Sequence, residues 1–175
     1  MALAAVYPSL RISALDSILL PDPSKPLSTS DFYLTIPFVI GSLFLSAGAL
    51  LRQACYRTLG RHFTFQLSLQ KDHKLVTEGP YSFVRHPSYL GMIIALPGMA
   101  VAQLFSSGTW WIQSGMWHTW QGQIFGAYWI SFLSYVCWAL LSRVPKEDAM
   151  LQAQFGEQWV SWSKKTRYAV IPYVW

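Results

Sequence analysis

Residues 32–51 read FYLTIPFVIGSLFLSAGALL, a run of 20 residues without Asp, Glu, Lys or Arg. An α-helix rises about 1.5 Å per residue, so this run is long enough to cross the roughly 30 Å hydrocarbon core of a bilayer. Proline is tolerated in a first helical turn, where Pro37 lies, and Gly41 allows a neighbouring helix to approach closely. The segment predicts a transmembrane helix.

A second uncharged gap runs from His86 to Ser142. It is too long for one crossing and suits two, which we place at 88–106 and 123–142. Pro97-Gly98 is expected to kink or break the first of these two helices. The connector between them, TWWIQSGMWHTWQGQ, contains four Trp and no formal charge, so we expect it to lie at the membrane interface.

The composition agrees with a membrane protein. Hydrophobic residues make up 53% and charged residues 12% of the chain, whereas soluble domains carry roughly 25% charged residues. An aromatic content of 16% excludes a disordered chain, and two cysteines are too few for a disulfide framework. The net charge of +5 accompanies long uncharged stretches, so we expect anionic lipid head groups, not nucleic acid, beside the basic residues.

The basic residues predict the topology. Six of them lie between the first and second spans, none between the second and third, and five in the tail. Three crossings place residues 52–87 and 143–175 on the same side, which the positive-inside rule makes cytoplasmic. Residues 1–20 are apolar but contain Pro8, Arg11 and Asp16, which favours an interfacial or short spanning helix over a cleaved signal.

The predicted fold is therefore an all-α integral membrane protein with about three transmembrane helices, an N-terminal interfacial or short spanning helix and a cytoplasmic amphipathic C-terminal helix. We divide it into an N-terminal apolar segment and linker, 1–31, and a membrane domain, 32–175, with a tail from 143. Pro145 is expected to begin a new helix in that tail. One apolar stripe of this helix would comprise Leu151, Phe155, Trp159 and Trp162.

The densest run of polar residues, HKLVTEGPYSFVRHPSYLG at 73–91, precedes the second span. Pro87 suits the first turn of a helix, whose free N–H groups would attract a carboxylate. Taken singly, Arg85 is typical of a snorkelling membrane anchor and requires an anionic partner at that depth. His86 taken singly is typical of a hydrogen-bonded imidazole. The histidines are scattered and the cysteines form no Cys-x-x-Cys pair, so no metal site is predicted.

This motif, together with RVPKEDAMLQAQFGEQW at 143–159 and IPYVW at 171–175, resembles the isoprenylcysteine carboxyl methyltransferase family. The likeness runs from about Gln66 to Trp175. Members of this family are integral membrane enzymes that move a methyl group from S-adenosylmethionine to the C-terminal carboxylate of a prenylated cysteine. The resemblance therefore implies carboxyl methylation in CaaX protein processing, residence in the endoplasmic reticulum, and a prenylated protein or small analogue as substrate.

The resemblance also implies roles for individual residues. The implied donor shell consists of Gln66, His73, Lys74, Leu75, Val76, Tyr81, His86, Pro87, Ser88, Tyr89 and Glu147. Arg143 is the implied contact that orients the substrate carboxylate. Asp148 stands where many relatives have Glu, which leaves its contribution open.

Elementary chemistry agrees with this assignment. Methyl transfer from a sulfonium to a carboxylate neutralises charge, so a site that excludes water favours it, and an ionised carboxylate needs no base. Plausible apolar walls for the prenyl tail are Ile93, Ile94, Leu96, Phe132, Tyr135 and Trp138. Two alternatives stay open: a methyltransferase acting on a phospholipid or other lipid amine, which requires a base, and a non-catalytic membrane scaffold descended from such enzymes.

Overall fold

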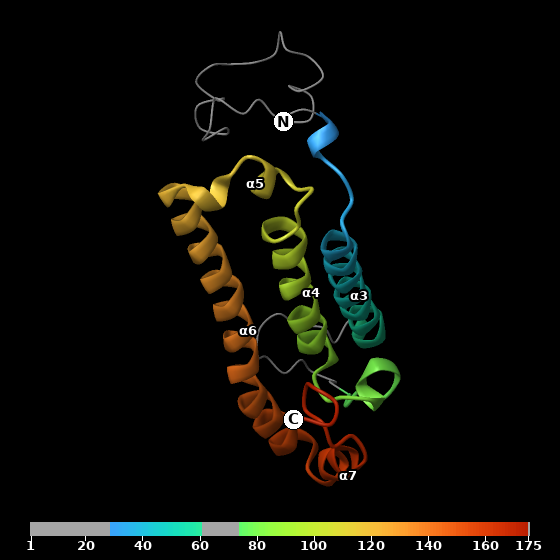
Figure 1. The fold of residues 1–175 in the computed structure, drawn as a ribbon. Helices are drawn as coiled ribbons and strands as arrows, with labels where there is room; N and C mark the ends of the chain where they lie inside the picture. The colour runs from blue at the N-terminus through green and yellow to red at the C-terminus, as the bar shows by residue number, and fades with distance from the viewer. Residues whose placement is uncertain (1–28, 61–73, 175) are drawn as a thin grey trace. The chain divides into compact units, whose positions relative to one another are not determined.

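The computed structural model describes residues 29–60 and 74–174, and the regular elements within these ranges are all helical. Three helices are long and apolar enough to cross a membrane: α3 (Ile36–Leu59), α4 (Pro87–Leu104) and α6 (Trp120–Phe155) (Figure 1). The predicted all-α integral membrane fold with three such helices is confirmed. Residues 1–28 and 61–73 lie outside the described ranges, so the N-terminal helix and the division at residue 31 stay predictions.

Five shorter elements complete the described chain. They are η2 (Thr29–Asp31), η4 (Gly79–Ser82), α5 (Trp110–Gln113), η5 (Met116–His118) and α7 (Glu157–Lys165). The chain forms two compact units. The first unit contains the described residues up to 44 and residues 97–133, and the second contains the described residues of 45–96 and 134–175. Each long helix contributes residues to both units.

Glycines bring α3 and α4 close together within each unit. In the second unit, a Cβ atom added to Gly91 would lie 2.8 Å from the carbonyl oxygen of Gly48. In the first unit, a Cβ atom on Gly41 would lie 2.6 Å from the carbonyl oxygen of Gly98. Both distances are shorter than carbon and oxygen tolerate, so only glycine permits these backbone contacts, as is common between membrane helices.

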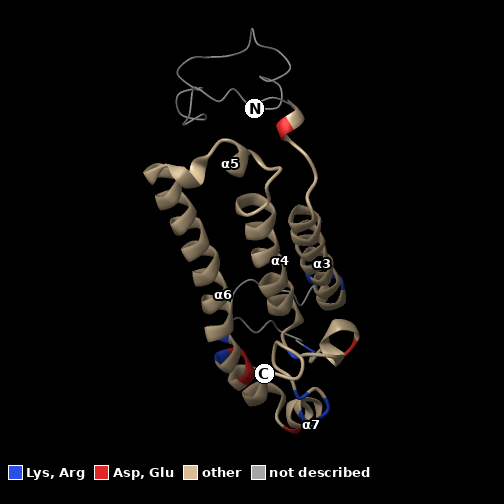
Figure 2. Ribbon diagram, in the orientation of Figure 1, with Lys and Arg blue, Asp and Glu red and all other residues tan. Residues whose placement is uncertain are grey.

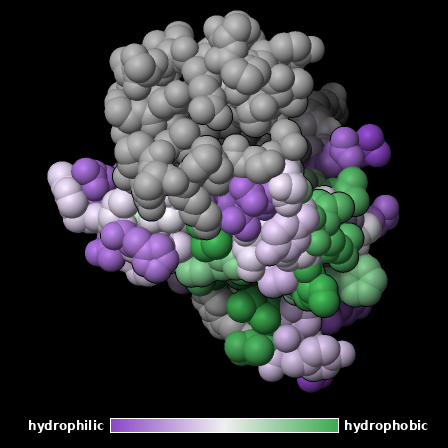
Figure 3. Space-filling model, turned by 45° about the horizontal axis from the view of Figure 1, so that its top comes forward, coloured by the Kyte–Doolittle hydropathy of each residue, from purple (hydrophilic) through white to green (hydrophobic). Residues whose placement is uncertain are grey.

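Large apolar side chains point outward from the long helices. On α6 the exposed ones are Trp120, Ile124, Phe125, Tyr128, Ile130, Phe132, Tyr135 and Trp138. Figure 3 shows hydrophobic side chains, coloured green, on the surface of the space-filling view. Charged residues instead gather near the ends of the long helices and on α7, as Figure 2 shows. An apolar helix surface of this kind is stable when lipid covers it.

Proline does not end either helix that contains it. α4 continues through Pro97 to Leu104, and α6 continues through Pro145 to Phe155. The prediction that a new helix begins at Pro145 is therefore wrong. An internal proline removes one backbone hydrogen bond and leaves the others, and tertiary packing can offset that loss. Here Val144, beside the proline, is buried against Ala169 and Val170.

The break occurs at Gly156 instead. This residue has a φ of +52°, a conformation that glycine adopts without steric cost, and α7 begins immediately after it. The apolar stripe predicted for one C-terminal helix is thereby divided between α6 and α7. Its last member, Trp162, is buried in a cluster with Cys55 and Tyr81.

Candidate functional site

The C-terminal segment that follows α7 pairs with the backbone just before α4. The Arg85 N–H donates to the Tyr168 carbonyl at 2.9 Å, and the His86 N–H donates to the Ala169 carbonyl at 2.8 Å. Val144 of α6 packs against the same segment. Within the second unit, these contacts bring together the start of α4, the charged part of α6 and the C-terminal segment.

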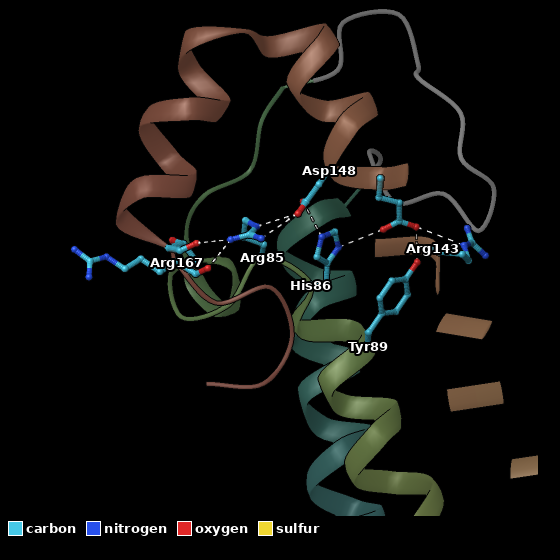
Figure 4. A network of polar contacts seen from close by, with 8 residues as sticks. Arg85, His86, Tyr89, Arg143, Asp148 and Arg167 are labelled. Atoms are coloured by element: carbon cyan, nitrogen blue, oxygen red, sulfur yellow. Dashed lines mark hydrogen bonds and ion pairs between the residues drawn. The ribbon is translucent and has the colours of Figure 1, made fainter. Parts of the chain in front are cut away.

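His86 lies between two carboxylates of α6 (Figure 4). Its Nε2 atom is 2.9 Å from Oδ1 of Asp148, and its Nδ1 atom is 3.3 Å from Oε2 of Glu147. Burial by itself lowers the pKa of the imidazole, but the hydrogen bonds to Asp148 and Glu147 outweigh that effect and raise the pKa above its ordinary value. Each ring nitrogen faces a carboxylate oxygen, and these two contacts favour the protonated ring, which can donate from both nitrogens.

Two further side chains, those of Tyr89 and Arg143, contact the carboxylate of Glu147. The Tyr89 hydroxyl donates to Oε1, and the Arg143 Nε atom lies 3.5 Å from the same oxygen. The Tyr89 ring is stacked on the His86 ring, with centroids 5.7 Å apart. Because α6 is continuous through Pro145, Arg143 and Glu147 are one turn apart and share a face, a relation that the sequence left open.

Asp148 also binds Arg85. The Nε and Nη2 atoms of Arg85 donate to Oδ2 of Asp148 at 3.2 and 3.0 Å. Its Nη1 atom donates to the carbonyls of Thr166 and Arg167. The anionic partner that Arg85 was expected to need is therefore Asp148, whose own contribution the sequence left open.

The start of α4 differs from expectation in one respect. The N–H groups of Tyr89 and Leu90 both donate to the His86 carbonyl, so neither is free to bind a carboxylate. Pro87 is almost fully buried as the first residue of the helix. Arg52 of α3 donates to the carbonyl and hydroxyl oxygens of Ser88, a contact that the sequence did not predict.

Apart from Lys74, the remaining predicted donor-shell residues belong to a neighbouring apolar cluster or lie outside the described ranges. Leu75 and Val76 pack against the cluster of Cys55, Tyr81 and Trp162. The Trp162 indole N–H donates to the Tyr81 carbonyl at 3.2 Å. Lys74 is exposed, and the predictions for Gln66 and His73 lie outside the described residues. The predicted residues that meet directly are His86, Tyr89, Arg143 and Glu147.

These features define an α-helical integral membrane protein with a buried charged cluster at the ends of its long helices. Residues 39–114 match the model of the isoprenylcysteine carboxyl methyltransferase (ICMT) family. Protein-S-isoprenylcysteine O-methyltransferase B of Arabidopsis thaliana is 31% identical over 139 residues, which are 77% of this chain and 58% of the relative. The protein-S-isoprenylcysteine O-methyltransferase of Schizosaccharomyces pombe is 30% identical over 125 residues, 70% of this chain and 44% of the relative. No solved structure matches the chain significantly.

These matches confirm the family resemblance drawn from the motifs: the chain is similar to the isoprenylcysteine carboxyl methyltransferases. The chain spans about half the length of the curated relatives it matches.

Proposed function

We propose that this chain transfers a methyl group from S-adenosylmethionine to the C-terminal carboxylate of a prenylated cysteine, giving a methyl ester. The observation that carries the proposal is the cluster of Arg143, Glu147, His86 and Tyr89, in which a carboxylate and a guanidinium lie one helical turn apart. The names of the relatives support the same reaction.

The cluster fits the amino-acid end of the donor, which carries an ammonium and a carboxylate. Glu147 offers the negative charge that an ammonium binds, and its carboxylate is held by His86 and Tyr89. His86 and Arg143 supply nearby positive charge for an anion. When bound, S-adenosylmethionine supplies a methyl group on a positively charged sulfur. Ser88 and Pro87 lie in the first turn of α4, next to the same cluster.

Arg143 suits the orientation of an acceptor carboxylate. Its side chain is 37% exposed, and its planar guanidinium matches both oxygens of a carboxylate. A carboxylate is already ionised at pH 7, so the reaction requires positioning and no base. Because the reacting charges neutralise each other, removing water from the site favours the transfer. We assign Arg143 the role of orienting the acceptor.

The state of His86 argues against an amine acceptor. An amine must lose a proton before it attacks, which requires a base at the site. The candidate base His86 lies between two carboxylates that raise its pKa and so favour its protonated form, and Asp148 is paired with Arg85. The positive charge of Arg143 would also repel a cationic amine. These features favour a carboxylate acceptor.

For the cellular setting, we propose that residues 52–87 and 143–175 face the cytoplasm and that the protein resides in the endoplasmic reticulum. The distribution of basic residues supports this orientation. The prenyl chain would reach the site from the bilayer along apolar helix surface. Tyr135 and Trp138 of α6, both exposed, offer such a surface on the helix that carries Arg143.

The test uses the purified full chain in lipid nanodiscs with S-adenosylmethionine carrying a radiolabelled methyl group. We expect base-labile methyl product with a farnesylated cysteine analogue, and a large loss of acceptor affinity in Arg143→Gln. The matched control, Arg57→Gln on the exposed surface of α3, should behave as wild type. A base-stable product with a phospholipid amine would indicate the rival reaction. The absence of product with either acceptor would indicate the scaffold.

A further inference from the structure

Asp148 uses its two carboxylate oxygens for two different partners. Oδ1 lies 2.9 Å from Nε2 of His86, and Oδ2 accepts from two nitrogens of Arg85. The Asp148 side chain is 16% exposed and that of Arg85 is 15% exposed, so water competes little for either contact. The orientation of the carboxylate is therefore determined from both sides.

Arg85 is in turn held by the main chain. Its Nη1 atom donates to two carbonyls that follow α7, at 3.2 Å for Thr166 and 2.6 Å for Arg167. Its backbone N–H donates to the Tyr168 carbonyl. Main-chain carbonyls do not change rotamer, so they give the guanidinium a fixed position from which it holds Asp148.

The His86 ring is surrounded by charged groups that favour its protonated form. From α6 it faces Glu147 and Asp148, with Arg143 behind Glu147, and from α4 it faces the ring of Tyr89. Arg85 precedes it in the chain, and the C-terminal segment contributes the Ala169 carbonyl to its backbone N–H. A neutral ring would turn one lone pair toward a carboxylate oxygen, whereas the imidazolium donates to both.

We propose that Asp148 and Arg85 are positioning residues: they hold the His86 ring with both nitrogens protonated, so that its Nδ1–H fixes the carboxylate of Glu147. Glu147 is the group to which we assign the donor ammonium, so the catalytic meaning of this inference rests on the proposed function. The proposal adds two residues to the donor site, one of them anchored by the C-terminal segment.

The direct test is an NMR titration of His86 in the full chain, labelled with ¹³C- and ¹⁵N-histidine and assigned by its absence in His86→Asn. Asp148→Asn removes a negative charge while keeping an oxygen acceptor, so the midpoint of His86 should fall by about one pH unit or more. Asp148→Glu keeps the charge and should stay near wild type. A midpoint in Asp148→Asn equal to that of wild type would overturn the proposal.

The second test separates positioning from a merely structural role. Arg85→Gln should raise the KM for S-adenosylmethionine about tenfold while kcat changes by less than about twofold, because Glu147 loses its fixed orientation. Arg85→Lys keeps the charge and should recover part of the affinity, and Arg57→Gln is the matched control. A fall in kcat at unchanged KM, as partial unfolding produces, would contradict the proposal. This comparison also decides the matter if Asp148→Asn does not fold.

The two hypotheses fail in different ways. If wild type forms no ester but Asp148→Asn still lowers the His86 midpoint, the positioning holds and the proposed function is wrong. If wild type forms the ester and neither His86 nor the donor KM responds to the substitutions, the positioning is wrong and the proposed function stands.

Discussion

The two compact units differ in where they carry charge. Among the described residues of the first unit, Asp31 is the only Asp, Glu, Lys or Arg. The contacts within this unit are instead glycine contacts, aromatic packing and hydrogen bonds such as that from the Trp117 indole N–H to the Leu104 carbonyl. The second unit buries His86 and pairs it with Glu147 and Asp148. Burying paired charges is costly unless every partner is satisfied. The comparison therefore supports placing the proposed chemistry in the second unit, where the charged cluster lies.

The largest expected effect concerns the contact between α3 and α4 in the second unit. Gly48→Ile would add a Cβ atom only 2.7 Å from the Cβ of Ala95, with the rest of the side chain beyond it, so we expect a loss of about 4 kcal/mol or more and little folded protein. Size-exclusion chromatography and thermal unfolding measure this. The neighbouring Ala49 is exposed, so the control variant Ala49→Ile should fold normally. Equal behaviour of the two variants would contradict the helix contact.

The next effect concerns the charge of Glu147. Glu147→Gln keeps the shape of the side chain but removes the charge assigned to the donor ammonium, so donor affinity should fall about a hundredfold. Titration calorimetry with S-adenosylmethionine measures the loss, and acceptor KM should change less. Glu157→Gln, exposed on α7, is the control. A larger effect on the acceptor than on the donor would reverse the roles of Glu147 and Arg143.

A smaller effect is the pH dependence of stability that His86 confers on the second unit. The pKa of His86 is raised in the folded protein, so its stabilisation is complete below the ordinary value of 6.5 and is lost as pH rises through the higher folded value. The difference in thermal midpoint between wild type and His86→Gln should therefore shrink from pH 6 toward pH 9. A difference that grows over this range would contradict the imidazolium.

The smallest effect tests the first unit. Trp117→Phe removes the 2.8 Å hydrogen bond from the indole Nε1 to the Leu104 carbonyl while retaining an aromatic ring. We expect a loss of about 1 kcal/mol of stability and unchanged kcat and KM. Thermal unfolding and the methyl-transfer assay check both parts. A change in donor KM would show that the first unit also serves the reaction.

The apolar part of the fold was predictable because it depends on composition. The run at 32–51 and the gap from 86 to 142 correspond to α3, α4 and α6, since a helix of about 20 apolar residues is readable one segment at a time. The end of the third helix was not predictable in this way. Local preference predicts a helix boundary at Pro145, whereas α6 continues through it and ends just before Gly156. Val144, next to this proline, is buried against the C-terminal segment, and that packing cannot be read from the local sequence.

The site shows the same division. The motifs singled out His86, Tyr89, Arg143 and Glu147, and the structure brings these four together. The partners of Arg85, by contrast, come from α6 and from the carbonyls after α7. An adjacent Arg-His pair and an adjacent Glu-Asp pair were the available signal, but neither pair by itself indicates which acid meets which base.

The amino-acid sequence by itself indicated a lipid bilayer as the environment of this protein, the three helices that are long enough to cross it and the family that its motifs resemble. Hydrophobicity and spacing are local properties, so they can be read without the tertiary structure. Only the tertiary structure decided that His86 lies between two carboxylates and that Arg85 binds one of them. A protonation state depends on the groups that burial brings within about 3 Å, and those groups are far apart along the chain.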